Sequence, residues 1–307
     1  MARRASGSYK ARRRTRRSYR RVSSVKKRTY RRTKRTSRPM SKKRILNITS
    51  TKKRNGMLSW SNTASTGASA TVAVNPAYVN GVGSGFFLWN ATAQDLTHSG
   101  GADNTIAQTA ARTSTSCFMR GLGEHIRIQT SSGLPWFWRR ICFTSKGGIS
   151  PASTADSPTQ TPRTYQDTTT GMVRLFFNVD VNNMPNTKNN LDGVIFKGAK
   201  GVDWNDFIVA PVDPARITVK YDRTRLLKSG NANGTIHEAK LWHPMNKNLV
   251  YDDDESGDLE ASSYVSTQSK AGMGDFYVLD IISPGTGGTT SDALLMQSNA
   301  TLYWHEK

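Results

Sequence analysis

Positive charge is concentrated at one end of this 307-residue chain. Residues 1–54 hold 24 of the 44 Lys and Arg side chains and no carboxylate, since the first acidic residue is Asp95. Residues 55–307 therefore carry 20 basic and 22 acidic side chains, a net charge of 20 − 22 = −2. Like charges at this density repel one another and leave little apolar surface to bury. The sequence predicts a disordered basic N-terminal arm over 1–54 and one near-neutral folded body over 55–307.

The body reads as an all-β protein. Short apolar or alternating runs are separated by Gly, Ser, Thr, Asn and Pro, which is typical of strands and turns. The alternation is clearest at 217–222 and 125–129, where a period of two places each set of side chains on one face of a sheet. Eight to ten such strands, with no sustained helical period, predict an antiparallel two-sheet sandwich. An eight-stranded jelly roll is the leading topology.

The individual elements follow from the same pattern. Residues 45–48 are expected to be the first segment to pair with the body, and 204–208 to form one short turn of helix. Further strands are expected at 86–89, 136–144, 172–181, 194–196, 237–242, 276–283 and 300–304, and long loops at 147–170, 182–192 and 251–263.

Secretion and membrane signals are absent from the pattern. The basic start is not followed by an apolar run of the length that a signal peptide needs. The longest apolar runs, 86–89 and 278–282, fall far short of the ~20 residues that cross a bilayer. We expect a soluble protein made inside the cell, with no membrane partner. Cys117 and Cys142 are too few for a disulfide framework or a four-cysteine zinc site, and we expect buried free thiols.

No enzyme signature fits the sequence. Gly193 and Gly198 have the spacing of a phosphate-binding loop, but Ala199 stands where that motif requires Lys. His237 and Glu238 begin a zinc-protease motif, but Leu241 occupies the position of its second His. We therefore expect no catalytic residues, no metal and no cofactor.

An acidic run extends from Asp252 to Glu260 and has three interpretations. It is a solvated loop, a contact for a basic neighbour such as another subunit, or a site for a divalent cation. An EF-hand loop that begins at Asp252 would place Ser263 where a bidentate Glu is required, which disfavours the cation site.

The basic arm is the strongest functional signal. Each Lys or Arg that neutralises a phosphate releases condensed counterions, which makes binding tight, salt-sensitive and independent of sequence. Tyr9, Tyr19 and Tyr30 lie among these cations, where their rings can stack on unpaired bases. The same clusters suit recognition by the host nuclear-import machinery, and a merely solubilising tail is the weaker interpretation. The candidate nucleic-acid-binding residues are Arg3, Arg4, Lys10, Arg12, Arg13, Arg14, Arg16, Arg17, Arg20, Arg21, Lys26, Lys27, Arg28, Arg31, Arg32, Lys34, Arg35, Arg38, Lys42, Lys43 and Arg44.

Residues 112–147, RTSTSCFMRGLGEHIRIQTSSGLPWFWRRICFTSKG, resemble the capsid proteins of genomoviruses, small viruses with circular single-stranded DNA. The Arg-rich start is similar to the same family in order and position, as are KKRILNITSTKKRNGMLSW at 42–60, FLWNATAQDL at 87–96 and NATLYWHEK at 299–307. The resemblance covers nearly the whole chain, although 150–275 match only loosely.

This resemblance implies a jelly-roll capsid subunit, about sixty copies of which form a small icosahedral shell. The arm would turn inward on a single-stranded DNA genome, and the protein would be found in the virion and, during assembly, in the host nucleus. A near-neutral body can pack against its own copies, whereas a strongly charged one would resist it. The alternative is a ribosomal or chromatin-like nucleic-acid-binding protein that acts in small complexes. A third class is a β-sandwich hydrolase with a basic tail.

Four residues inside the best-matching stretch are further candidates: Trp136, Trp138, Arg139 and Arg140. They lie in a predicted strand whose two faces are both largely apolar. The strand is therefore either central and buried on both sides or in contact with a neighbouring subunit, and direct stacking of Trp136 or Trp138 on bases is the weaker alternative. Arg139 and Arg140 either reach phosphate from the inner surface of a shell or pair with a carboxylate.

Overall fold

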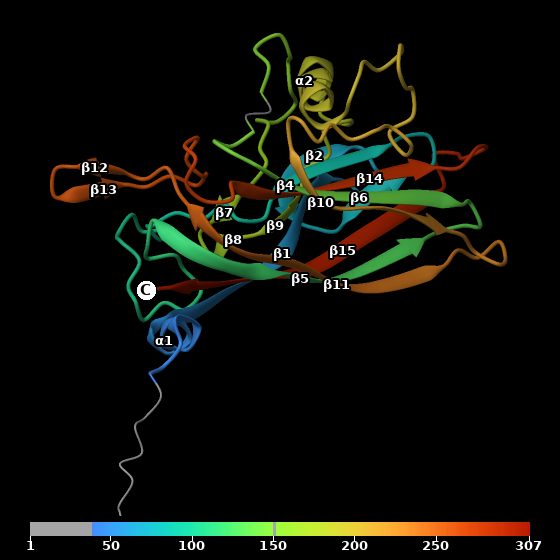
Figure 1. Ribbon diagram of the computed structural model, residues 1–307. Coiled ribbons are helices and arrows are strands. Elements are labelled where there is room, and N and C mark those ends of the chain that lie inside the picture. The colour runs from blue at the N-terminus through green and yellow to red at the C-terminus, as the bar shows by residue number, and fades with distance from the viewer. Residues whose placement is uncertain (1–38, 150–151) are drawn as a thin grey trace, which may run out of the picture.

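Antiparallel strands form most of the structure, a computed structural model that describes residues 39–149 and 152–307. Two sheets face each other as the layers of a sandwich, with helix α2 (Pro185–Ile195) above one layer and helix α1 (Lys42–Thr49) below the other, near the C-terminus (Figure 1). The prediction of an all-β sandwich is confirmed. The disorder expected over the arm, 1–54, is wrong for residues 42–54, which form a helix and the start of the first strand, and residues 1–38 lie outside the described residues.

The elements follow one another as α1 Lys42–Thr49, β1 Thr51–Thr63, β2 Ser69–Val74, β3 Ala77–Asn80, β4 Gly85–Asn90, β5 Ser116–Thr130, β6 Trp136–Ser145, β7 Asp167–Thr168, β8 Gly171–Met172, β9 Arg174–Phe176, α2 Pro185–Ile195, β10 Thr218–Leu227, β11 Ile236–Val250, β12 Asp254–Ser256, β13 Leu259–Ala261, β14 Asp275–Pro284 and β15 Ala293–Glu306.

Eight of the strands pair in a nested order, namely β1, β4, β5, β6, β10, β11, β14 and β15. One sheet runs β11-β5-β15-β1-β2, with β3 beside β15 and β9 beside β1, and the other runs β10-β6-β14-β4. Within these sheets β1 pairs with β15, β4 with β14, β5 with β11 and β6 with β10, all antiparallel. Of these eight strands, the first in the chain therefore lies beside the last and the second beside the seventh. The third likewise lies beside the sixth and the fourth beside the fifth.

Three strands of the four-stranded sheet, β4, β6 and β14, are buried on both faces, whereas the edge strand β10 is largely exposed. In β4 the Phe86 ring lies 5.8 Å from that of Phe207 on one side, whereas the Phe87 ring lies 5.7 Å from that of Phe176 on the other. The segment from α2 to β10 covers the outer face, where Trp204 packs against Phe207. This double cover explains why these strands are continuous apolar runs rather than alternating ones.

Two helices replace elements that the sequence predicted differently. Residues 45–48, expected to pair with the body, lie in α1, where the Ser41 hydroxyl accepts a hydrogen bond from the backbone N–H of Arg44 as an N-cap. The expected loop 182–192 contains most of α2, which begins at Pro185 and buries Thr187, Leu191 and Ile195 on one face. The expected strand 194–196 is the end of this helix, and 204–208 form turns and a bridge instead of helix.

Other elements in the structure also begin or end at residues different from those that the sequence predicted. The expected strand 172–181 is broken after the short strand β9 by bends and turns, and the expected loop 251–263 contains the β12–β13 hairpin. Strand β1 begins at Thr51, so the folded body starts inside the segment that the charge pattern assigned to the arm.

A network of four buried charges joins the two sheets. Glu124 of β5 accepts hydrogen bonds from Arg140 of β6 (2.5 Å) and Arg174 of β9 (3.0 Å). Asp280 of β14 binds the same two arginines at 2.8 and 2.6 Å and also accepts from the Trp138 indole N–H at 2.8 Å. All four charged side chains are almost completely buried, so each depends on the others for the solvation that water no longer supplies.

Removing one charge from this network should destabilise the fold strongly. The substitution Asp280→Asn leaves an uncompensated buried positive charge, and we expect a loss of about 3–5 kcal/mol in the free energy of unfolding. Urea unfolding measures it. The matched control is Glu238→Gln, because Glu238 lies 3.7 Å from the His125 imidazole and its own side chain is 62% exposed. That control should lose less than about 1 kcal/mol; equal losses in the two variants would contradict the role of the network.

The same network predicts a dependence on pH. Burial alone raises the pKa of Asp280, but the charge of Arg140, its hydrogen bond and the charge of Arg174 outweigh burial and hold the pKa at about 2, below the ordinary value of 3.8. A depressed folded-state pKa contributes stability above the unfolded-state pKa, and this contribution is lost as the pH falls through the folded-state value. The stability difference between wild type and Asp280→Asn should therefore be constant above about pH 5 and shrink toward pH 2. A difference that stays constant down to that pH would be the contrary result.

Candidate nucleic-acid interface

Most of the predicted arm residues, from Arg3 to Arg38, lie outside the described residues. Lys42, Lys43 and Arg44 belong to α1, and the side chains of Lys42 and Arg44 are exposed. Helix α1 leads directly into β1, whose first residue Thr51 pairs with Glu306 near the C-terminus. The arm is therefore joined to the body at the end of the sheet where the start of β1 pairs with the end of β15.

The last three basic residues of the polycation, Lys52, Lys53 and Arg54, alternate between the two faces of β1. Lys53 points inward, where its ammonium group donates to the carbonyl oxygen of Ala111 and the hydroxyl of Thr113, both at 2.8 Å, and pairs with Glu306 at 3.0 Å. Lys52 and Arg54 are exposed on the opposite face of the strand. One of these cations therefore holds β1 against the C-terminal strand, and the other two face solvent.

The exposed face that carries Lys52 and Arg54 continues across β15, β5 and β11, and we call it the basic sheet face. Its cations are Lys52, Arg54, Arg120, Arg127 and Lys240, all exposed, together with His125 and His305. Register brings them into rows, since Lys52 pairs with His305, His305 with Phe118, and His125 with Lys240. The strands that form the face come from four separate parts of the chain.

Carboxylates are scarce on the basic sheet face. Glu238 lies there, 3.7 Å from the His125 imidazole. Among the described residues no carboxylate lies within ion-pair distance of Lys52, Arg54, Arg120, Arg127 or Lys240. Partial burial and the charges of Arg120 and Lys52 lower the pKa of His305, which reflects positive potential at this face. Such a surface suits a polyanion.

The four candidates of the central strand lie inside the subunit. Trp136, Trp138 and Arg140 are nearly inaccessible, and the Arg139 side chain pairs with Asp222 at 2.7 Å and donates to the carbonyl oxygens of Phe207 and Ala210. Both arginines are thus paired with carboxylates, and β6 is buried on both sides between β10 and β14. These residues contribute to folding and offer no surface for phosphate, for bases or for a neighbouring subunit.

Most of the acidic run lies in the β12–β13 hairpin, whereas Asp252 and Asp253 lie just before it. Asp253 is held by Arg112, whose guanidinium binds both carboxylate oxygens, at 2.5 and 2.9 Å, and lies 3.8 Å from the Tyr251 ring. The remaining acidic residues of the run have exposed or partly exposed side chains. Across residues 39–149 and 152–307 no group of three or more His, Cys, Asp or Glu side chains is placed to hold a metal ion.

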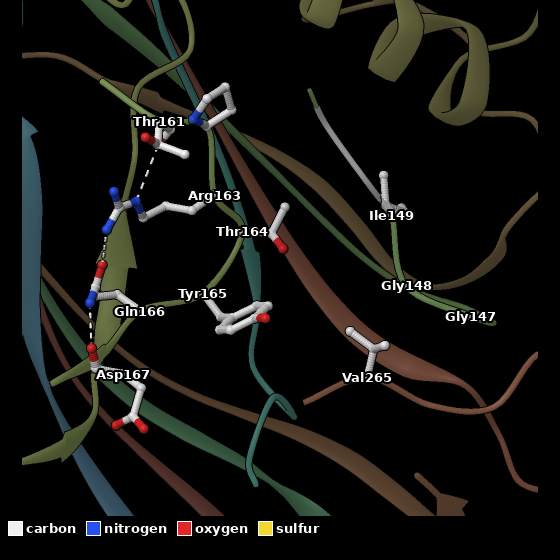
Figure 2. A pocket seen from close by; sticks show the side chains of 11 residues that line it. Gly147, Gly148, Ile149, Thr161, Arg163, Thr164, Tyr165, Gln166, Asp167 and Val265 are labelled. Carbon is white, nitrogen blue, oxygen red and sulfur yellow. Dashed lines mark hydrogen bonds between the residues drawn. The ribbon is translucent and has the colours of Figure 1, made fainter. Parts of the chain in front are cut away.

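A depression of about 490 Å³ lies near these loops. Figure 2 shows Thr161, Arg163, Gln166 and Asp167 along one segment, with Val265 and Ile149 on the far side of the hollow. The Arg163 guanidinium donates to the backbone oxygen of Thr161 and to the side-chain oxygen of Gln166, so it is engaged within its own segment. Among the described residues that line it no set of polar groups converges, so the hollow has no assigned role.

Two further observations bear on the class of protein. In the part of the chain that the structure describes, neither helix is long and apolar enough to cross a membrane. Comparison with models of known protein families and with curated proteins finds no match to this chain.

The basic sheet face was not recognised from the sequence as a site. Its signal was present at 125–129, where His125, Arg127 and Gln129 alternate with buried Ile126 and Ile128. Arg120 and Lys240 lie in other strands, and only sheet register brings them onto one surface.

The two cysteines are buried free thiols, as predicted. Burial raises the pKa of both thiols, and the neighbouring Glu306 raises that of Cys117 further. Because the thiolate is the reactive form, we expect neither cysteine to react with a thiol reagent in the native protein at pH 7 to 8, and both to react in denaturant. Labelling followed by mass spectrometry measures this. Rapid labelling of either cysteine in the folded protein would contradict the assignment.

Proposed function

We propose that this protein is the coat subunit of a small icosahedral shell that packages single-stranded DNA through its basic arm. The observation that carries the proposal is the attachment of 21 basic residues, without one acid, ahead of the first strand of a β-sandwich whose own charge is close to zero. Counterion release from phosphates supplies genome capture, and the near-neutral body is free to associate with its own copies.

The strand order supports the jelly roll as the finer description of the sandwich. Nested antiparallel pairing of first with last strand is what results when one long hairpin is rolled into two sheets. When the eight strands of the nested pairing are numbered 1 to 8 along the chain, the sheets run 6-3-8-1 and 5-4-7-2. Strands β2, β3, β7, β8, β9, β12 and β13 lie outside this set and belong to the connections.

The charge balance supports genome packaging. About sixty copies, the number that the resemblance to genomovirus capsid proteins implies, would bring roughly 60 × 21 = 1,260 positive charges from the residues ahead of β1 into a shell, enough to neutralise a comparable number of phosphates. On this proposal the protein is found in the virion and, during assembly, in the host nucleus, with the same basic clusters read by the host import machinery.

The first expected result concerns assembly. The purified full-length protein, a chain of 33.9 kDa, should elute as particles of roughly 2 MDa with bound nucleic acid and appear as closed shells in negative-stain images. Elution as a monomer or dimer with bound nucleic acid would favour a protein that acts in small complexes. Elution as a monomer without nucleic acid under all buffers would contradict both functions.

The second expected result concerns the arm. A variant without residues 1–38 keeps α1 and β1, so its body should fold with unchanged thermal stability while its particles or subunits lose bound nucleic acid. A matched variant of full length, with the 18 basic residues of 1–38 changed to Gln, should show the same loss, because charge and not length is the cause. Packaging with an unchanged salt dependence in either variant would refute the role of the arm.

A further inference from the structure

Trp242 is an exposed indole in the middle of a long strand. Its side chain is 52% exposed, whereas Trp89, Trp136, Trp138 and Trp304 are almost wholly buried. The alternation of β11 places it on the basic sheet face with Lys240, while Ala239 and His243 point inward. Tryptophan is enriched at interfaces, because its large ring supplies contact area there.

The backbone holds this indole in place. A Cβ atom added at Gly121 would lie 2.6 Å from Trp242 Cζ2, and one added at Gly123 would lie 3.6 Å from Trp242 Cε3. The ring therefore lies across two glycines of the neighbouring strand β5, with no side chain beneath it. The Tyr303 ring of β15, on the far side of β5, lies 5.7 Å away at an interplanar angle of 58°. Trp242 and Tyr303 form an aromatic ridge across three strands.

Cations flank the aromatic ridge. Arg54 is the direct register partner of Tyr303, and Lys240 lies two residues before Trp242 on the same face of β11. His125 is the register partner of Lys240. Aromatic rings among exposed cations on an open sheet are the arrangement with which proteins bind unpaired bases and their phosphates without sequence preference.

We propose that the aromatic ridge is a stacking site for the bases of single-stranded nucleic acid, with Arg54, Lys240 and Arg127 on the phosphates. The inference rests on the proposed function in taking this polymer as the ligand, but it adds a binding site on the body that is separate from the arm. Helix α1 lies at the end of this face (Figure 1), where the Lys52 ammonium group donates to the carbonyl oxygen of Asn47 at 2.9 Å, so the chain enters the body on the side that carries the ridge. Charge complementarity favours a polyanion over a second copy of this chain, whose matching face would bring the same cations.

Photocrosslinking of the full-length protein tests this inference. The probe is a thymidine oligonucleotide with 5-iododeoxyuridine, which crosslinks to aromatic side chains that stack on it, and peptide mass spectrometry locates the adducts. We expect adducts on Trp242 or Tyr303. Adducts confined to Tyr9, Tyr19 and Tyr30 would overturn the stacking site and leave the arm function standing, whereas failure to bind the probe at all would refute both.

Variants at the ridge give an independent test. At a salt concentration that screens the arm, Trp242→Ala should weaken oligonucleotide binding about 5- to 150-fold, and Trp242→Phe should retain most of it. The matched control is Leu226→Ala, since Leu226 is 51% exposed on β10 of the other sheet; its binding should not change. Equal binding in Trp242→Ala and wild type would overturn the proposal, as would a Trp242→Ala protein that fails to assemble yet binds the oligonucleotide normally, because the ridge would then be a contact between subunits.

Discussion

The buried network of Glu124, Arg140, Arg174 and Asp280 is the constraint on which the rest of the structure depends. Two positive and two negative charges with no access to water are tolerable only if each meets its partners, and this requires β5, β6, β9 and β14 to converge at one point between the sheets. Apolar packing alone would accept several relative positions of two sheets. The network selects one of them, although uncharged residues of similar volume could stabilise the sandwich equally well.

The same constraint determines what the outer surface displays. A strand turns alternate side chains to opposite faces, so the register that points Glu124 inward also points Gly123, His125 and Arg127 outward. A slip of one residue would bury His125 and Arg127 and expose Glu124. The basic sheet face and the ion network are therefore two sides of one register, and the glycine floor under Trp242 belongs to it as well.

Charge is divided among three tasks along the chain. The arm carries cations with no acid near them in sequence, Lys53 is withdrawn from this set to hold the first strand against Glu306, and the basic sheet face presents further cations from strands distant in sequence. The nested pairing of strands places the arm's attachment, the C-terminal strand and this face side by side. On the proposed function, one polymer can then run from the arm onto the body.

The amino-acid sequence by itself determined the division into a polycation and a near-neutral β body, because net charge and a period of two are local properties that need no partner strand. It also identified the buried thiols and the central strand 136–144. Tertiary structure alone decided that Arg139 and Arg140 pair with carboxylates, because Asp222 and Asp280 lie far away in the chain. The sequence pattern did not predict helix α2, because its buried face is short and depends on the sheet beneath it. Only sheet register brought Trp242, Tyr303 and Arg54 together, because pairing between distant strands, and not their sequence neighbours, sets which side chains share a face.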